Sequence, residues 1–145
     1  MLWIALAVAA GGCIAVQAAA NGSLRTNLDD PRYAAFFSIC GTIVTAVLAM
    51  LVLRPPFPAA AAIRGTPWWT WIGGPLGAVF VLAGAALAPR LGAAAFISAV
   101  VAGQLFCSLA LDHFGLMNVP QQPLTAARLL GAALVFAGVL LVKYV

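Results

Sequence analysis

Charge is the property that this chain most lacks. Only 3 of its 145 residues are Asp or Glu and 7 are Lys or Arg, whereas 65% are hydrophobic. Ordinary soluble domains are about 45 to 50% apolar, even when glycine is counted. The composition therefore predicts an integral membrane protein with no room left for a soluble domain.

Ionisable side chains are also missing from the depth of every apolar run. No Asp, Glu, Lys or Arg lies deep in a run, so the buried carboxylate that commonly exchanges protons for cationic solutes is absent. Asp112 stands beside the single histidine, His113, at the end of a run. We leave two roles open for this pair: a proton relay or gate, and a solvated or capping helix end near Gly115.

The residue types that catalysis needs do not occur at suitable spacings. Neither the pair at 112 and 113 nor the scattered cysteines Cys13, Cys40 and Cys107 supply a nucleophile beside a base, or a set of metal ligands. We therefore expect no enzyme, no cofactor, no metal and no disulfide. The net charge of +4 is spread over loops and forms no basic patch, so we expect no nucleic-acid partner either.

Five apolar runs each approach the roughly 20 residues that a helix needs to cross a bilayer. They cover residues 2–21, 33–53, 68–88, 91–111 and 124–143. The first run has no Lys or Arg before Arg25, so it lacks the basic start of a cleaved signal peptide and is expected to remain a span. The prediction is an all-α integral membrane protein with five transmembrane helices in one domain, residues 1–145.

Proline, aspartate and arginine mark the expected connections. The third and fourth runs are almost continuous, so we expect a tight turn at Pro89-Arg90. Residues 22–32 form the expected first loop, where Asp29-Asp30-Pro31 is a start signal for the second helix. Residues 54–67 are rich in proline and predict an extended, exposed loop. The last loop covers residues 112–123, after which Thr125 opens the final helix.

Basic residues are divided almost evenly between the two sides of the membrane. With five spans, one side carries Arg25, Arg32, Arg90 and Lys143, and the other carries Arg54, Arg64 and Arg128. Since Lys/Arg asymmetry sets orientation, this chain has no strong instruction to insert one way up. We consider three arrangements: one dominant orientation, an antiparallel homodimer of dual topology, and a heterodimer with an oppositely inserted sister chain.

Amide side chains are the main polar groups within the runs. Gln17 and Asn21 are four residues apart and share one helix face, and Gln104 lies near the middle of the fourth run. Amides cannot face lipid cheaply, so they either bond to neighbouring helices or line a cavity. We predict a substrate cavity lined by these three amides, and the interhelical role stays open for each.

Aromatic and glycine residues complete the candidate site. Trp71 ends a tryptophan cluster that favours anchoring at the interface, with an aromatic wall for a solute as the second interpretation. Gly74 lies in a glycine-proline stretch that suits close packing or a break near a cavity. Gly131 and Gly138 lie two helical turns apart in the last run, where they suit either a dimer interface or packing within the chain.

Taken together, these motifs resemble the YdcZ-type proteins of the drug/metabolite transporter superfamily. The residues that carry the resemblance are 17–25, 38–42, 71–78, 103–105, 111–115, 128–131 and 138–139. The resemblance implies a five-helix protein of the bacterial inner membrane. Such a protein is equivalent to half of a ten-helix inverted-repeat transporter, and works as a pair or in a tandem gene product.

The small multidrug resistance proteins are a more distant comparison in that superfamily. The glycine pair at 131 and 138 resembles their dimerisation helix, but the first-helix glutamate that binds cations and protons there has no counterpart here. The sequence thus favours a secondary transporter of small polar metabolites or drug-like solutes, with membrane lipid, the solute and a second chain as partners. The alternative is a non-transporting membrane subunit that stabilises another protein.

Overall fold

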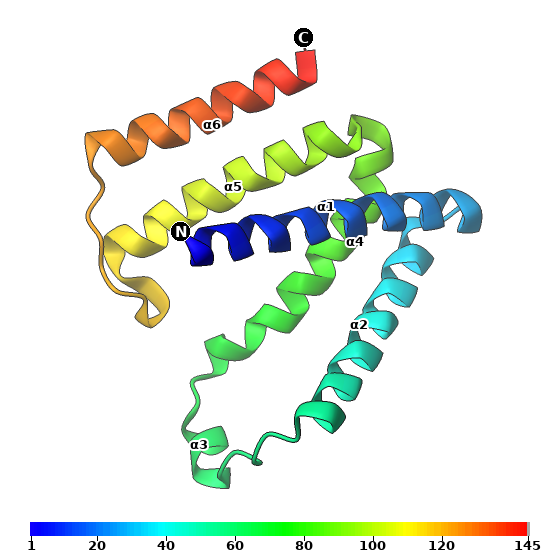
Figure 1. Ribbon diagram of the computed structural model, residues 1–145, viewed down its shortest axis with the longest axis vertical. Coiled ribbons are helices and arrows are strands. Elements are labelled where there is room, and N and C mark those ends of the chain that lie inside the picture. The colour runs from blue at the N-terminus through cyan, green and yellow to red at the C-terminus, as the bar shows by residue number, and fades with distance from the viewer. Residues whose placement is uncertain (145) are drawn as a thin grey trace. The chain divides into compact units, whose positions relative to one another are not determined.

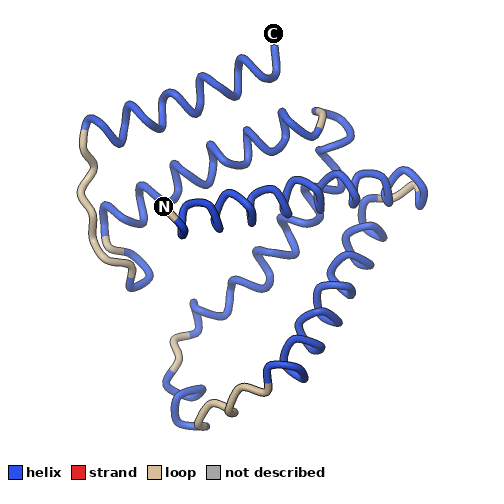
Figure 2. The backbone as a smooth tube through the Cα atoms, in the orientation of Figure 1, coloured by secondary structure: helices blue, strands red, loops and turns tan. Residues whose placement is uncertain are grey.

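The chain is helical almost throughout (Figures 1 and 2). The computed structural model describes residues 1–144. Five helical segments are long and apolar enough to cross a membrane: α1 (Leu2–Leu28), α2 (Pro31–Leu53), the segment Trp68–Leu91, α5 (Ala93–Phe114) and α6 (Ala126–Tyr144). The third consists of a 3-10 helix, η1 (Trp68–Ile72), followed by α4 (Gly73–Leu91). The predicted all-α membrane protein with five spans is confirmed at this level.

The chain divides into two compact units. One contains Met1–Gln17 and the chain from Leu87 onward, and the other is Ala18–Ala86. In the first unit α5 packs along α6, where Ala132 is buried and the rings of Phe106 and Phe136 meet edge to face with centroids 6.3 Å apart. The second unit contains the end of α1, then α2, the short helix α3 (Ala60–Gly65) and α4 as far as Ala86.

Small side chains occupy most buried positions. The buried apolar residues are Phe96, Leu109 and eight alanines, at positions 18, 34, 35, 85, 88, 95, 102 and 132. In a bilayer the lipid is as apolar as leucine, so helices associate through close backbone approach, which alanine permits. Large apolar residues on the outside are then expected, and Leu51, Leu130 and Leu141 are among the many that are exposed.

The first connection is much shorter than the sequence predicts. Residues 22–28 continue α1, so the expected loop 22–32 shrinks to Asp29 and Asp30. Within this extension the hydroxyl of Thr26 donates a hydrogen bond to the Gly22 carbonyl at 3.1 Å, which satisfies the hydroxyl without breaking the helix. The prediction was wrong because a polar stretch at a membrane surface can remain helical.

The start signal for the second helix is confirmed, with α2 beginning at Pro31 rather than at residue 33. Asp30 is the N-cap and accepts a hydrogen bond from the backbone nitrogen of Arg32 at 2.7 Å. The Arg32 guanidinium also binds the same carboxylate, with Nη2 to Oδ2 at 2.6 Å. Side-chain and then backbone hydrogen bonds from Arg32 lower the pKa of Asp30 below its ordinary value, because they favour the ionised carboxylate.

The tight turn between the third and fourth spans exists, but its residues differ from the predicted pair. Pro89 and Arg90 belong to the last turn of α4, and the chain reverses at Gly92, whose φ is +86°. Glycine adopts this backbone conformation without the steric cost of a Cβ. Near the end of the helix, Pro89 removes a single hydrogen bond, so the helix extends past it.

Two further connections contain helix that the sequence analysis did not predict. Residues 54–67 were expected to be extended throughout, yet a run of alanines, which are strong helix formers, folds into α3. Beyond α5, which ends at Phe114 rather than at 111, a second 3-10 helix covers Leu116–Asn118. Thr125 opens α6 as predicted, its hydroxyl accepting a hydrogen bond from the Arg128 backbone at 3.3 Å.

Candidate functional site

The first two predicted site residues lie well inside α1. Because this helix continues to Leu28, neither Gln17 nor Asn21 stands at its end. Gln17 is half-buried and Asn21 is buried, with 6% of its surface exposed. Within residues 1–144, neither side-chain amide makes a hydrogen bond to another residue. Each amide therefore keeps its donors and acceptors for another partner.

Gln104 lies at the middle of α5, which runs from 93 to 114. It is exposed, and its side-chain amide makes no hydrogen bond within the described part of the chain. Its backbone carbonyl accepts a hydrogen bond from Ser108 Oγ at 2.7 Å, which leaves the amide itself free. An unpartnered amide at the centre of a membrane-spanning helix is costly to expose to lipid.

Trp71 and Gly74 lie where η1 meets α4. Trp71 is 58% exposed, and Gly74 is the second residue of α4. No atom lies within 4 Å of the position that a Cβ on Gly74 would occupy, so this face of the helix is open. These two residues and Asn21 belong to the unit Ala18–Ala86, whereas Gln17 and Gln104 belong to the other. A single cavity that joins all five stays a prediction.

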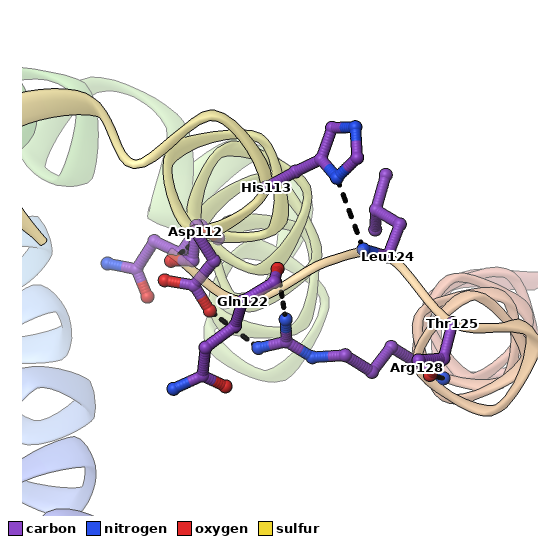
Figure 3. Close-up of polar contacts among 8 residues, drawn as sticks. Asp112, His113, Gln122, Leu124, Thr125 and Arg128 are labelled. Atoms are coloured by element: carbon purple, nitrogen blue, oxygen red, sulfur yellow. Dashed lines mark hydrogen bonds and ion pairs between the residues drawn. The ribbon is translucent and has the colours of Figure 1, made fainter. Parts of the chain in front are cut away.

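A cluster of polar contacts, here called the polar corner, joins the end of α5 to the start of α6 (Figure 3). Asp112 Oδ2 and Arg128 Nη2 are 2.5 Å apart, with 26% and 30% of the two side chains exposed. Arg128 Nη1 also donates to the Gln122 carbonyl at 3.1 Å, and the Gln122 backbone nitrogen donates to the Asp112 carbonyl at 2.7 Å. The loop between the two helices is thus held to both of them.

His113 takes part in the same corner through its ring. Its Nδ1 accepts a hydrogen bond from the Leu124 backbone nitrogen at 3.2 Å (Figure 3). Its backbone carbonyl accepts another from Gln121 Nε2 at 2.9 Å. Gly115, with φ of +61°, caps α5 beside it. The capping role considered for residues 112 and 113 therefore has a structural counterpart, and the proton or gate role stays a prediction.

Sequence reasoning missed Arg128 and Gln122 as partners of Asp112. Asp112 and Arg128 are 16 positions apart, on either side of the last loop. The available signal was one acidic and one basic residue at the two ends of a short loop between antiparallel spans. Such a placement brings opposite charges to the same membrane surface, where they can pair.

The glycines of the predicted dimer interface are uncovered on α6. Gly131 is exposed and Gly138 is half-exposed, and no atom lies within 4 Å of a Cβ built on either. They lie roughly 130° around the helix from the side of Ala132 and Phe136, which packs on α5. This face is open in the single chain, and what covers it stays a prediction.

One open hollow lies away from the predicted site residues. It has a volume of about 330 Å³ and is lined by Arg32, Ala35, Phe36, Ile39, Ala78, Val79 and Leu82 of α2 and α4. Apart from Arg32 its lining is apolar, as expected for a groove that faces lipid. Among the described residues no three His, Cys, Asp or Glu side chains gather as metal ligands.

Comparison with known proteins gives one finding at the level of the family. The family model described as "Putative inner membrane exporter, YdcZ" matches residues 2–141. No curated protein and no solved structure was found to match the chain. Exporters are transport proteins and not an enzyme class, and the five membrane-length helices agree with a multi-pass protein of the inner membrane with a transport role. Since the match covers nearly the whole chain, this protein belongs to the YdcZ family of the drug/metabolite transporter superfamily.

Proposed function

We propose that the chain is a secondary transporter of small polar metabolites or drug-like solutes, and that it works by alternating access at the interface of two chains. Its cavity is lined by the amides of Gln17, Asn21 and Gln104, with Trp71 as an aromatic wall and Gly74 as an open backbone position. The family relationship supports transport in general. The solute class and the paired arrangement are the parts that we add.

The observation that carries this proposal is the free amide of Gln104. It sits at the middle of α5, is exposed, and has no side-chain hydrogen bond within residues 1–144. A group of this kind persists in a membrane helix when it faces water, a solute or a second protein chain. Ser98 and Ser108 of the same helix differ, because their hydroxyls bond to the helix's own carbonyls.

Amide chemistry indicates the kind of solute. Each amide offers donors and an acceptor but no net charge, so it suits neutral or zwitterionic solutes. A hard ion would lose its hydration shell without gaining an opposite charge. The absence of acidic residues from the depth of the spans also disfavours proton exchange through a buried carboxylate.

Pairing supplies the second half of the pathway. Five spans are half of the ten in inverted-repeat transporters of this superfamily, and two oppositely oriented chains restore the pseudo-symmetry that alternating access uses. We favour an antiparallel homodimer, with a heterodimer with a sister chain as the other arrangement. The corner of Asp112 and His113 would then lie at a cavity end, where it can act as a gate.

Accessibility of residue 104 to water tests the proposal directly. In a background with Cys13, Cys40 and Cys107 replaced by serine, Gln104→Cys in vesicles is treated with a charged methanethiosulfonate reagent. Ala99→Cys is the matched control, because Ala99 is also exposed on α5 but lies roughly 140° around the helix. We expect Gln104→Cys to react and Ala99→Cys to remain unmodified.

The other outcomes separate the alternatives. If neither cysteine reacts although the protein is folded and paired, the amide bonds to a partner helix, and the non-transporting subunit replaces the transporter. If both react equally, residue 104 lies on no specific cavity. Transport of labelled zwitterionic amino acids into the same vesicles, with Gln104→Ala as the variant, then measures whether the reactive position serves transport.

A further inference from the structure

Residues 54–69 comprise the connection after α2 and the first two residues of the third span, and they carry positive charge that no carboxylate within residues 1–144 pairs with. The segment contains Arg54 and Arg64 and no acidic residue. Within residues 1–144 the two ion pairs join Arg32 to Asp30 and Arg128 to Asp112, so neither arginine of this segment is paired with a carboxylate. Arg54 Nε donates to the Leu51 carbonyl at 3.4 Å, which leaves its two terminal nitrogens free.

The same segment exposes aromatic rings. Phe57 and Trp68 are 91% and 78% exposed, and Ile63 of α3 is exposed as well. Large rings left this open in water would be costly, whereas Trp is favoured at the boundary between headgroups and acyl chains. Over 16 residues the structure therefore combines two guanidinium groups that lack a carboxylate partner within residues 1–144 with apolar anchors.

Its attachment holds the segment at the membrane surface. Arg54 directly follows Leu53, the last residue of α2, and Trp68 is the first residue of the next span. The chain leaves the membrane at the end of α2 and enters it again at the start of the third span. Both ends of the segment therefore lie at the headgroup layer on the same side of the membrane. Figures 1 and 2 show α3 between two loops, beyond the ends of α2 and α4.

We propose that residues 54–69 form a binding surface for anionic phospholipid. Arg54 and Arg64 bind the headgroup phosphates, and Phe57 and Trp68 insert at the acyl boundary. A guanidinium group presents paired donors that match phosphate oxygens, and each basic residue close to an anionic surface strengthens its attraction. This surface shares no residue with the proposed solute cavity, so the two proposals can fail independently.

Tryptophan quenching by brominated lipids provides the test. The chain has four tryptophans, and Trp3→Phe with Trp71→Phe leaves Trp68 and Trp69 as reporters within the segment. The protein is placed in phosphatidylcholine vesicles that contain a small fraction of either brominated phosphatidylglycerol or brominated phosphatidylcholine. We expect stronger quenching by the anionic lipid, and a preference that falls as salt is raised, because the attraction is electrostatic.

Neutral replacements of the two arginines identify the source of the preference. Arg54→Gln and Arg64→Gln should each lower the preference for phosphatidylglycerol about fivefold, and the double variant should lower it further. Arg25→Gln and Arg90→Gln are controls that remove the same charge elsewhere and should leave it unchanged. If the double variant is not recovered folded, the two single variants carry the same test.

Two results would overturn the proposal. One is equal quenching of the parent protein by both brominated lipids, which would mean no selection of anionic headgroups. The other is a preference that survives both arginine replacements or falls equally in the Arg90→Gln control, since the selection would then reside outside residues 54–69.

Discussion

Asp112 and Arg128 form an ion pair between the end of α5 and the start of α6. Each is about one-quarter to one-third exposed, so solvent screens the pair only in part. Replacing one partner leaves the other charge partly buried and unpaired, which costs more than the pair itself contributes. We expect Arg128→Gln or Asp112→Asn to lower the free energy of unfolding by about 1 to 3 kcal/mol.

The measurement is unfolding in detergent followed by near-ultraviolet circular dichroism. The double variant Asp112→Asn/Arg128→Gln should lose less than the sum of the two single variants, since it leaves no unpaired charge. Arg90→Gln is the control, because within residues 1–144 its guanidinium has no ion-pair partner. Additive losses in the double variant would show that the two side chains act separately.

At the level of the helices, the chain reversal between α4 and α5 depends on Gly92. Gly92 has φ of +86°, yet no atom lies within 4 Å of a Cβ built on it. A side chain there would fit in space but strain the backbone, so Gly92→Ala should destabilise the protein by about 1 to 3 kcal/mol. Gly12→Ala, in open space within α1, should be neutral or slightly stabilising. Thermal unfolding of both variants in detergent compares the two effects, and equal stabilities would contradict the role of the positive φ.

The number and approximate length of the membrane-spanning helices could be predicted, because bilayer thickness sets how long such a helix must be. Five apolar runs of nearly constant length follow from the hydrocarbon core, and all five appear as helices. The exact ends of the helices depend on whether polar flanking residues continue the helix or leave it, and the apolar pattern does not show this. Residues 22–28 continue α1, and the chain reverses at Gly92 instead of Pro89. For the candidate site, the places of the three amides along their helices could be predicted from the sequence. The pairing of Asp112 with Arg128 could not, because it depends on how α5 packs against α6.

Over the whole molecule, the ion pairs leave the balance of basic residues unchanged. On the five-span insertion, Arg32 lies on one side of the membrane and Arg128 on the other, and each is neutralised by an aspartate. Acidic partners contribute little to orientation, so the division of basic residues stays four to three. A difference of one favours neither orientation strongly, which supports the proposed antiparallel pair.

Pairing of two chains through α6 gives the last prediction. Gly131 and Gly138 have open space around them in the single chain, so a leucine there should not disturb the fold of one copy. If the two glycines allow close approach of a second chain, Gly131→Leu should overpack that contact by about 1 to 3 kcal/mol, a roughly 5- to 150-fold weaker association. Ala133→Leu is the matched control, because Ala133 is exposed on the same helix roughly 160° away. Counting photobleaching steps of singly labelled protein in dilute vesicles measures the fraction of pairs. A fraction that falls equally in both variants, or in neither, would place the interface on another helix, because only a contact through the glycine face distinguishes the two leucines.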